Sequence, residues 1–256
     1  MKAVILAGGL GSRLSEETDR VPKPMVRIGR MPILWHIMKI YSHHGINDFV
    51  ICLGYKGEVI KQFFLEMRST LSDFTIDIGS GAISYHDKSH DDWRVTLIDT
   101  GDATMTGGRV KRIAPYLDNE AFCLTYGDGV ADVDVQKVIA FHHEQKRLAT
   151  VTAVEPPGRF GALELTGDRV GSFSEKIDNK NAYVNGGFFV LEPGCLDYIT
   201  NDATVWEQEP LERLAAAEQL AAYRHKGFWK PMDTINDKRF LEDLWVKGNA
   251  PWKVWP

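Results

Sequence analysis

A short apolar segment near the N-terminus runs directly into a cluster of glycines, and this feature most constrains what the chain can fold into. Residues 2–7 are rich in β-forming side chains, as expected of a strand. Three glycines follow within four positions: Gly8, Gly9 and Gly11. Because glycine has no side chain, the N–H groups of such a loop come close to a bound anion. Arg13 and Lys23 add positive charge beside it, so the segment is suited to a polyphosphate.

Two well-known phosphate-binding loops are excluded by the residues at their required positions. A P-loop has Lys and then Ser or Thr after its last glycine, and here Ser12 follows Gly11 directly. The dinucleotide fingerprint needs a third glycine where Leu14 stands. A glycine-rich turn can also be a plain tight connection, but a plain connection has no need of two nearby cations.

Composition limits the architecture and the class of partner. A chain of 256 residues with 44% hydrophobic content can bury one large core. We expect a single domain over 1–256. The net charge of −5 argues against a nucleic-acid surface. No apolar run is long enough for a membrane helix or a signal peptide, so we expect a cytoplasmic protein without a membrane partner.

Cysteines and histidines give no indication of a metal site. The cysteines are few, widely spaced and set in apolar segments, which is typical of buried reduced thiols: Cys52, Cys123 and Cys195. Two pairs of adjacent histidines stand at 43–44 and 142–143. Neighbours on a helix point about 100° apart and do not chelate one ion from one face, so we interpret both pairs as helix-surface residues.

The hydrophobic periodicity predicts an α/β protein. In the first half, apolar β-rich segments alternate with helical patterns, which favours a mostly parallel sheet. We expect strands there at 2–7, 48–53, 75–78, 94–98, 121–126 and 149–154, and helices at 32–44, 58–67, 108–117 and 133–146. After residue 155 shorter strands at 162–165, 169–173 and 183–191 indicate antiparallel additions, followed by helices at 207–219 and 234–246. Trp252 and Trp255 in the tail should dock on the domain itself or on a neighbouring subunit.

A series of segments in fixed order resembles the sugar-1-phosphate nucleotidyltransferase family. The segments that carry the resemblance are 6–14 with 22–24, 126–129, 157–161, 175–176, 185–187 and 229–234. The likeness extends over almost the whole chain and is greatest to the branch that uses CTP and glucose 1-phosphate. One departure is Ser12, where the family more often has Thr, and the hydroxyl is kept.

The resemblance implies a fold, a reaction and a setting. The fold would be a Rossmann-like, mostly parallel mixed sheet flanked by helices, of the nucleotidyltransferase and glycosyltransferase-A type. The reaction would transfer a cytidylyl group with Mg²⁺ as cofactor and would release pyrophosphate. The product would enter dideoxysugar synthesis for bacterial lipopolysaccharide O-antigen. The family also implies a homo-oligomer, in this branch a hexamer. Within the single domain it implies a nucleotide-binding half over about 1–155 and a half for sugar-phosphate binding and oligomerisation over about 156–256.

Four charged residues are the candidates for catalysis. Arg13 is expected to hold the leaving pyrophosphate, and Lys23 to neutralise charge at the α-phosphate. Asp128 follows a predicted strand and stands between two glycines, which presents its carboxylate openly. Asp233 precedes the last predicted helix, where Asp is also a common N-cap. The resemblance assigns Asp128 and Asp233 to the metal.

The remaining candidates are substrate contacts. The nucleotide side comprises Leu6, Ala7, Gly8, Gly9, Gly11, Ser12, Thr104, Arg109 and Gly127. The sugar side, which the resemblance implies, comprises Arg159, Glu175, Lys176, Asn185 and Gly186. Structural alternatives remain open for three of these residues: a solvated strand end for Lys176, a surface turn for Arg159 and an N-terminal helix turn for Arg109.

Residue types do not reveal the base. Cytosine differs from uracil and thymine by a few donors and acceptors that backbone atoms can read, so only the resemblance indicates CTP. A thymidylyl- or uridylyltransferase is the alternative, as is a non-catalytic nucleotide-sugar-binding regulator. Retention of Arg13, Lys23, Asp128 and Asp233 together speaks against the regulator, which has no need of the metal carboxylates.

Overall fold

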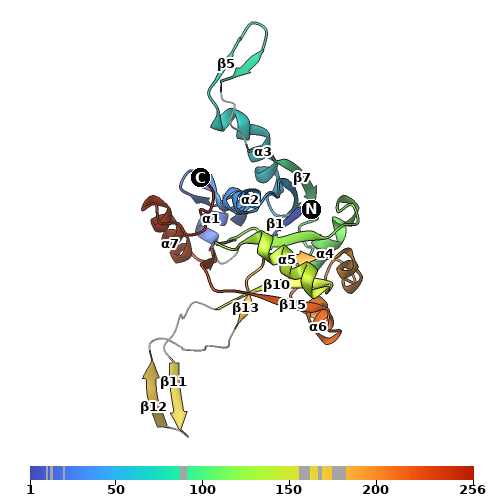
Figure 1. The fold of residues 1–256 in the computed structure, drawn as a ribbon. Helices are drawn as coiled ribbons and strands as arrows, with labels where there is room; N and C mark the ends of the chain where they lie inside the picture. The colour runs from blue at the N-terminus through green and yellow to red at the C-terminus, as the bar shows by residue number, and fades with distance from the viewer. Residues whose placement is uncertain are drawn as a thin grey trace.

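A mixed sheet forms the centre of the molecule in the computed structural model, which describes residues 1–9, 11, 14–19, 21–86, 91–155, 162–166, 169–174 and 183–256 (Figure 1). Strand β1 (Ala3–Leu6) lies between β4 (Asp48–Leu53) and β8 (Phe122–Tyr126), parallel to both, and β7 (Arg94–Asp99) pairs parallel with β4. All four residues of β1 are buried, as expected for a parallel strand that is covered on both faces. The predicted parallel core is confirmed.

Antiparallel strands extend this core beyond β8. Strand β14 (Phe189–Leu191) pairs antiparallel with β8, and β10 (Ala149–Val154) pairs antiparallel with both β14 and β13 (Val184–Asn185). Strand β15 (Leu220–His225) then adds parallel to β10. The sheet is therefore mixed. The antiparallel additions predicted after residue 155 are confirmed in β13 and β14, whereas the strand at 149–154, predicted to extend the parallel pattern, pairs antiparallel with both of them and parallel only with β15.

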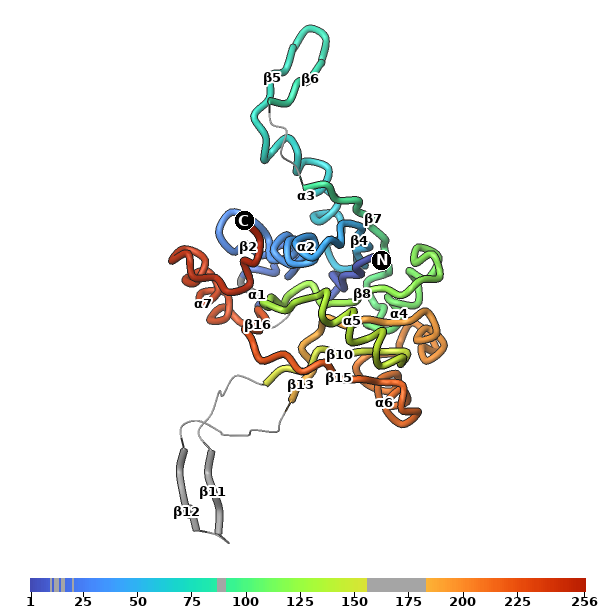
Figure 2. The backbone as a smooth tube through the Cα atoms, in the orientation of Figure 1, coloured from blue at the N-terminus to red at the C-terminus, as the bar shows by residue number. Residues whose placement is uncertain are grey.

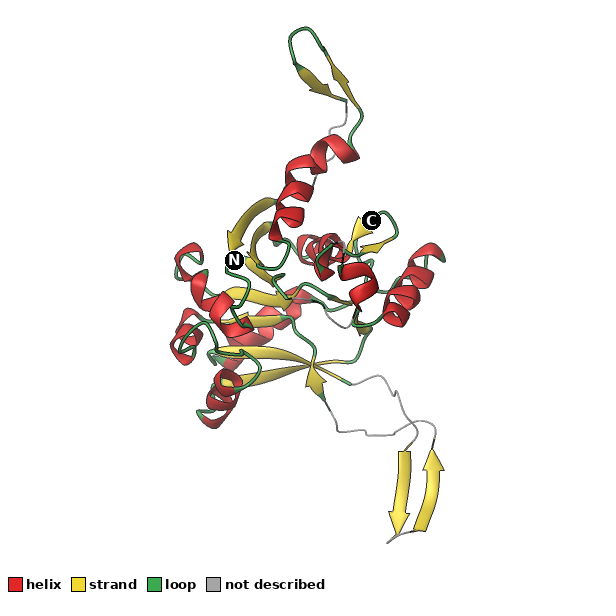
Figure 3. Ribbon diagram, turned by 180° about the vertical axis from the view of Figure 1, so that it is seen from behind, coloured by secondary structure: helices red, strands yellow, loops and turns green. Residues whose placement is uncertain are grey.

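Helices cover both faces of the sheet (Figure 3). Side chains alternate along β1, so Ala3 and Ile5 join one core cluster while Val4 and Leu6 join the other. The first cluster includes residues of α2 (Ile33–His43), α5 (Val135–Gln145) and α7 (Ile235–Val246). The second includes residues of α4 (Thr106–Arg112) and α6 (Glu209–Ala216). Helix α1 (Ser15–Thr18) is a single turn after the glycine loop.

Short strands complete the described chain. Antiparallel pairs join β2 (Arg27–Ile28) to β3 (Met31–Pro32), β9 (Gly129–Ala131) to β16 (Trp229–Pro231), and β11 (Ala162–Thr166) to β12 (Arg169–Ser174). Within the described residues, 3₁₀ turns lie at Lys23–Met25, Ala114–Tyr116 and Pro193–Tyr198. No helix in the described part of the chain is long and apolar enough to cross a membrane.

An arm projects from the body (Figure 2). Helix α3 (Gly57–Leu71) runs outward, four residues beyond the predicted end, and leads into the hairpin of β5 (Phe74–Ile76) and β6 (Ile83–Tyr85). Large apolar side chains on this arm face solvent, with Leu65 and Ile78 each 83% exposed. Exposed apolar side chains of this size are typical of surfaces that take part in protein–protein contacts.

Several expectations from the sequence need correction. The strand predicted at 75–78 lies at 74–76 in a hairpin outside the central sheet, and the helix predicted at 207–219 spans only 209–216 and is followed by the unpredicted strand β15. The helix predicted at 108–117 starts at Thr106 and ends at Arg112, because Pro115 cannot donate the next helical hydrogen bond. The strand predicted at 183–191 is split into β13 and β14, because positive φ values at Gly187 and Phe188 interrupt the pleat. His142 is buried rather than on the helix surface, and its Nδ1 lies 2.9 Å from Thr150 Oγ1.

Two further interpretations have definite outcomes. The three cysteines are buried and free, as expected, and burial raises the pKa of Cys52 to about 12. The aromatic tail docks on its own chain, where Trp252 and Trp255 are buried against α2. This contact decides between the two fates that the sequence left open for the tail.

His36 lies at the centre of the tail's contact. Its Nε2 donates to the carbonyl of Ile28 at 3.0 Å, and its Nδ1 accepts from Trp252 Nε1 at 3.4 Å. Rings of Trp245 and Trp255 pack on the imidazole as well. Burial lowers the pKa of His36 to about 4, so the ring is neutral at physiological pH.

We predict that the folded state loses stability as pH falls from 6.5 to about 4. In that interval the unfolded chain protonates His36 and the folded chain does not, from the ordinary value of 6.5 and the folded value of about 4. Full expression of this difference amounts to about 3 kcal/mol of unfolding free energy. Urea unfolding of wild type and His36→Gln across this pH range measures it. An equal pH slope in the two proteins would contradict the assignment.

Candidate functional site

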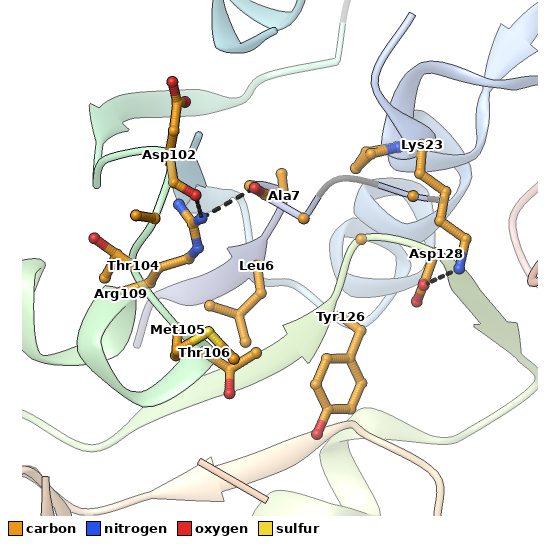
Figure 4. A pocket seen from close by; sticks show the side chains of 16 residues that line it. Leu6, Ala7, Lys23, Asp102, Thr104, Met105, Thr106, Arg109, Tyr126 and Asp128 are labelled. Carbon is orange, nitrogen blue, oxygen red and sulfur yellow. Dashed lines mark hydrogen bonds and ion pairs between the residues drawn. The ribbon is translucent and has the colours of Figure 1, made fainter. Parts of the chain in front are cut away.

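A cavity of about 500 Å³ opens at the carboxyl ends of the central parallel strands. This volume suits a small-molecule ligand, and the position is where open α/β sheets bind ligands. Figure 4 shows Lys23 and Asp128 on one side, Arg109 and Asp102 on the other, and Leu6 between them. The cavity is lined by Leu6, Ala7, Gly8, Gly9, Gly11, Lys23, Pro24, Asp102, Ala103, Thr104, Met105, Thr106, Arg109, Tyr126, Gly127 and Asp128.

The glycine loop leaves the end of β1 and forms one wall of the cavity. Ala7 N donates to Cys52 O at 3.0 Å, which ties the start of the loop to the neighbouring strand. Gly11 has φ +64°, a conformation that favours glycine, and its carbonyl accepts from Leu14 N at 2.9 Å. Ser12 and Arg13 lie outside the described residues.

Lys23 bridges two carboxylates beside the cavity. Its Nζ lies 2.6 Å from Asp128 Oδ2 and 2.8 Å from Asp233 Oδ1. Burial of the ammonium lowers its pKa, but the two aspartates outweigh that effect, so the pKa of Lys23 is above its ordinary value. Two carboxylates therefore converge on one cation, with the Lys23 side chain 11% exposed.

Pairing of β9 with β16 brings the two aspartates together, although they are more than a hundred positions apart in sequence. Gly129 pairs with Pro231, and Met232 N donates to Asp128 O at 2.8 Å. Asp128 directly precedes β9, and Asp233 follows β16 by two residues. A two-stranded ladder thus fixes the spacing of the carboxylates.

The N-cap of α7 is Thr234, not Asp233. The Thr234 hydroxyl accepts from Asp237 N at 3.2 Å, and Asp237 Oδ2 accepts from Thr234 N at 2.9 Å, which forms a capping box. The capping role that the sequence allowed for Asp233 is therefore taken by its neighbour. The carboxylate of Asp233 is directed to Lys23 instead.

The donor set fits a hard divalent cation. Mg²⁺ is typically held by one or two carboxylates, together with phosphate oxygens and waters. Asp128 and Asp233 supply two carboxylates that share one cation in this structure. Among the residues described, no group of three or more His, Cys, Asp or Glu side chains forms a self-sufficient metal cage. The pair is thus suited to a cation that a phosphate ligand helps to hold.

Arg109 links several segments of the chain around the cavity through hydrogen bonds. Its guanidinium donates to the carbonyls of Leu53 at 2.9 Å and Gly8 at 3.0 Å, and to Thr100 Oγ1 at 2.7 Å. Burial lowers its pKa, yet an arginine stays charged at neutral pH. A Cβ at Gly8 would overlap the guanidinium, so this close approach requires glycine. Arg109 lines the cavity, as expected, and also holds the glycine loop in place.

The sugar side is described in part. Asn185 Nδ2 donates to Tyr126 Oη at 3.0 Å, and Gly186 O accepts from Trp229 Nε1 at 2.8 Å. Asn185 thus adjoins the cavity through Tyr126, whereas the partner of Gly186, Trp229, is not among the residues that line the cavity. Arg159, Glu175 and Lys176 lie outside the described residues.

Sequence reasoning missed several residues that shape the cavity. Tyr126 belongs to a recognised motif but was not expected to act, and Asp102 and Thr106 flank an expected contact. Glu207 gave no sequence signal at all, yet its Oε1 accepts from Tyr126 Oη at 2.6 Å and its Oε2 from Thr106 Oγ1 at 2.7 Å. Tyr126 could have been found from its place at the carboxyl end of a predicted strand, and Thr106 from its place in the segment that contains Thr104 and Arg109.

Comparison with known proteins gives consistent matches over the whole chain. Residues 2–232 match the family described as nucleotidyl transferase. A glucose-1-phosphate cytidylyltransferase of Salmonella typhimurium is 59% identical over 256 residues, all of both chains. A probable glucose-1-phosphate cytidylyltransferase of Bacillus subtilis is 43% identical over the same span. A crystal structure of a putative glucose-1-phosphate thymidylyltransferase from Bacillus anthracis superposes with TM-score 0.70 at 18% identity, covering 100% of this chain and 97% of that one.

We predict that Arg109→Leu destabilises the fold by about 3 kcal/mol, because it removes several charge-assisted hydrogen bonds from buried carbonyls. Arg112→Leu on the same helix is the matched control. Its guanidinium pairs with the exposed Asp202, a contact worth at most about 1 kcal/mol, and donates one hydrogen bond to Thr100 O at 3.1 Å, so its loss should cost less than that of Arg109. Equilibrium urea unfolding compares the two. Equal losses would mean that Arg109 does not clamp the loop.

Proposed function

Because the chain belongs to the nucleotidyl transferase family, we propose that it transfers a cytidylyl group from CTP to α-D-glucose 1-phosphate, giving CDP-glucose and pyrophosphate. The names of the relatives that match it end to end support this substrate pair. One structural observation carries the proposal: Asp128 and Asp233 converge on Lys23 at the rim of a nucleotide-sized cavity behind a glycine loop.

The reaction needs positioning and charge stabilisation rather than a protein nucleophile. A phosphate oxygen of glucose 1-phosphate attacks the α-phosphorus of CTP in line, and pyrophosphate leaves from the opposite side. Nucleophile and leaving group are both ionised at neutral pH, so no general base is required. The chain's contribution is to hold two anions together against their repulsion.

Each cation has a separate task in this proposal. Lys23 neutralises charge at the α-phosphate, which its flexible stem can reach from its place between the aspartates. Arg13 holds the leaving pyrophosphate, with its planar fork on two oxygens. The N–H groups of Gly8, Gly9 and Gly11 assist both by binding phosphate oxygens.

Asp128 and Asp233 would hold Mg²⁺. When bound, this ion supplies positive charge to the reacting phosphates and templates their oxygens. The β9–β16 ladder holds the segments that carry the two carboxylates, while the flexible stem of Lys23 lets its ammonium move. On the sugar side, Arg159, Glu175, Lys176, Asn185 and Gly186 remain the proposed contacts for glucose 1-phosphate.

The setting of the enzyme is also a proposal. The exposed apolar side chains on the arm of α3, β5 and β6 support a homo-oligomer, whereas the aromatic tail does not, because it is buried within its own chain. The hexamer, the single-domain organisation with its two halves and the cytoplasmic location stay predictions. The place in O-antigen dideoxysugar synthesis follows from the proposed product.

We predict that purified protein with Mg²⁺ and glucose 1-phosphate releases pyrophosphate in strong preference with CTP. Parallel assays with CTP, UTP, dTTP, ATP and GTP measure the base preference. Turnover with UTP or dTTP instead would keep the mechanism and change the proposed base. Silence with all five would favour a regulatory protein or another sugar phosphate.

We predict that Asp128→Asn lowers kcat by roughly 10² to 10³-fold while the fold is kept, because one charge that neutralises the reacting phosphates is lost. Asp243→Asn is the control, since Asp243 is an exposed carboxylate that pairs only loosely with Lys247 on α7. Pyrophosphate release and circular dichroism measure activity and fold. Near-native turnover of Asp128→Asn would remove this residue from the site.

A further inference from the structure

The carboxylate of Glu207 is hydrogen-bonded to two residues that line different parts of the cavity. Glu207 stands in the segment before α6 and is half-buried. Its two oxygens accept from different walls: Oε2 from Thr106 at 2.7 Å and Oε1 from Tyr126 at 2.6 Å. Thr106 and Tyr126 both line the cavity, where Figure 4 shows their side chains below Leu6.

We propose that Glu207 is a positioning residue that fixes the nucleotide wall and the sugar-side amide in one arrangement, through Thr106 on one side and Tyr126 with Asn185 on the other. The proposal rests on the proposed function, because it takes the assignment of those two sides from it. It adds a residue that neither the sequence nor the reaction points to.

The direction of every hydrogen bond in this network follows from the chemistry of its members. An ionised carboxylate only accepts, so the hydroxyls of Thr106 and Tyr126 both donate to Glu207. Thr106 Oγ1 is then free to accept, and it accepts from Trp206 N at 2.9 Å. Burial and the neighbouring Glu207 raise the pKa of Tyr126, which keeps its hydroxyl protonated as a donor.

The same logic fixes the amide of Asn185. Because the Tyr126 proton is committed to Glu207, Tyr126 Oη accepts from Asn185 Nδ2 at 3.0 Å. Asn185 Oδ1 accepts from Gly187 N at 2.8 Å, at the break between β13 and β14. Among the described residues, no acceptor is bonded to the second N–H of this amide. The network therefore presents a donor on the sugar side, where hydroxyl and phosphate oxygens accept.

The nucleotide wall depends on the same segment of chain. Met105 N donates to Asp202 O at 2.8 Å and Gly107 N to Thr204 O at 3.0 Å. Carbonyls of the segment before α6 thus accept from the N–H groups at the start of α4. A Cβ at Gly108 would lie 2.6 Å from the backbone of Asp202, which shows how closely the two segments approach. Glu207 ends this contact with a side-chain bond to Thr106, the first residue of α4.

Three variants separate the two branches of the network. Tyr126→Phe removes only the hydroxyl that links Glu207 to Asn185, Thr106→Val removes only the hydroxyl on the nucleotide side, and Glu207→Gln weakens both. Glu209→Gln is the matched control, because Glu209 is two residues away, exposed and paired only with Arg213 on its own helix. Thr106→Ser keeps the hydroxyl and serves as the rescue variant.

We expect Tyr126→Phe to raise KM for glucose 1-phosphate about tenfold and to leave KM for CTP within about twofold, as for one lost hydrogen bond to a charged group. Thr106→Val should raise KM for CTP and leave KM for glucose 1-phosphate nearly unchanged. Thr106→Ser should keep both constants at their wild-type values. Glu207→Gln should raise both constants, and Glu209→Gln neither. A merely structural role would lower the melting temperature or kcat without this split between substrates.

The opposite results are equally defined. Equal changes in both KM values for Tyr126→Phe and Thr106→Val, or Glu207→Gln indistinguishable from the control, would overturn the proposal. If Glu207→Gln fails to fold, the split between the Tyr126 and Thr106 variants still decides. Wild-type protein that does not turn over CTP with glucose 1-phosphate would refute the proposed function instead, and calorimetric binding of each ligand alone to the same variants then tests the network.

Discussion

The repulsion between Asp128 and Asp233 is the constraint on which the site depends. Two carboxylates held close by the β9–β16 ladder need a cation between them, and Lys23 supplies it at 2.6 and 2.8 Å. Lys23 is the first residue of a 3₁₀ turn and stands between Pro22 and Pro24, which restrict the backbone that carries it. The strand ladder and the turn thus bring two negative charges and one positive charge together beside the glycine loop. A phosphate ligand that arrives with its own cation enters a site whose charges are already in place.

Much of the parallel core could be predicted from sequence because its signals are local. The strand at 48–53 has the predicted bounds, since it is an almost continuous apolar run that ends at a glycine. Asp128 was placed correctly at a strand end for the same reason. The strand at 149–154 also has the predicted bounds, but its antiparallel pairing was not predicted. The glycine loop and Lys23 were recognised from spacing alone, and the structure brings them to one cavity.

The parts that could not be predicted depend on contacts between distant segments. Burial of His142 follows from the packing of α5 on the sheet, which helical periodicity does not specify. The break between β13 and β14 depends on a positive φ at Phe188, a residue type that gives no warning of it. Glu207 acts through side chains 81 and 101 positions away, so no window of sequence contains the network.

The β9–β16 ladder also has a consequence for how the protein is made. Its two strands close a loop of roughly a hundred residues, and the entropy of that closure is recovered only after the intervening chain has formed its own contacts. A nascent chain that ends before β16 has the glycine loop and Lys23 but only one of the two carboxylates. The complete arrangement of Lys23 between Asp128 and Asp233 is thus one of the last features to form during synthesis. A partly made chain therefore cannot bind the nucleotide as the finished protein does.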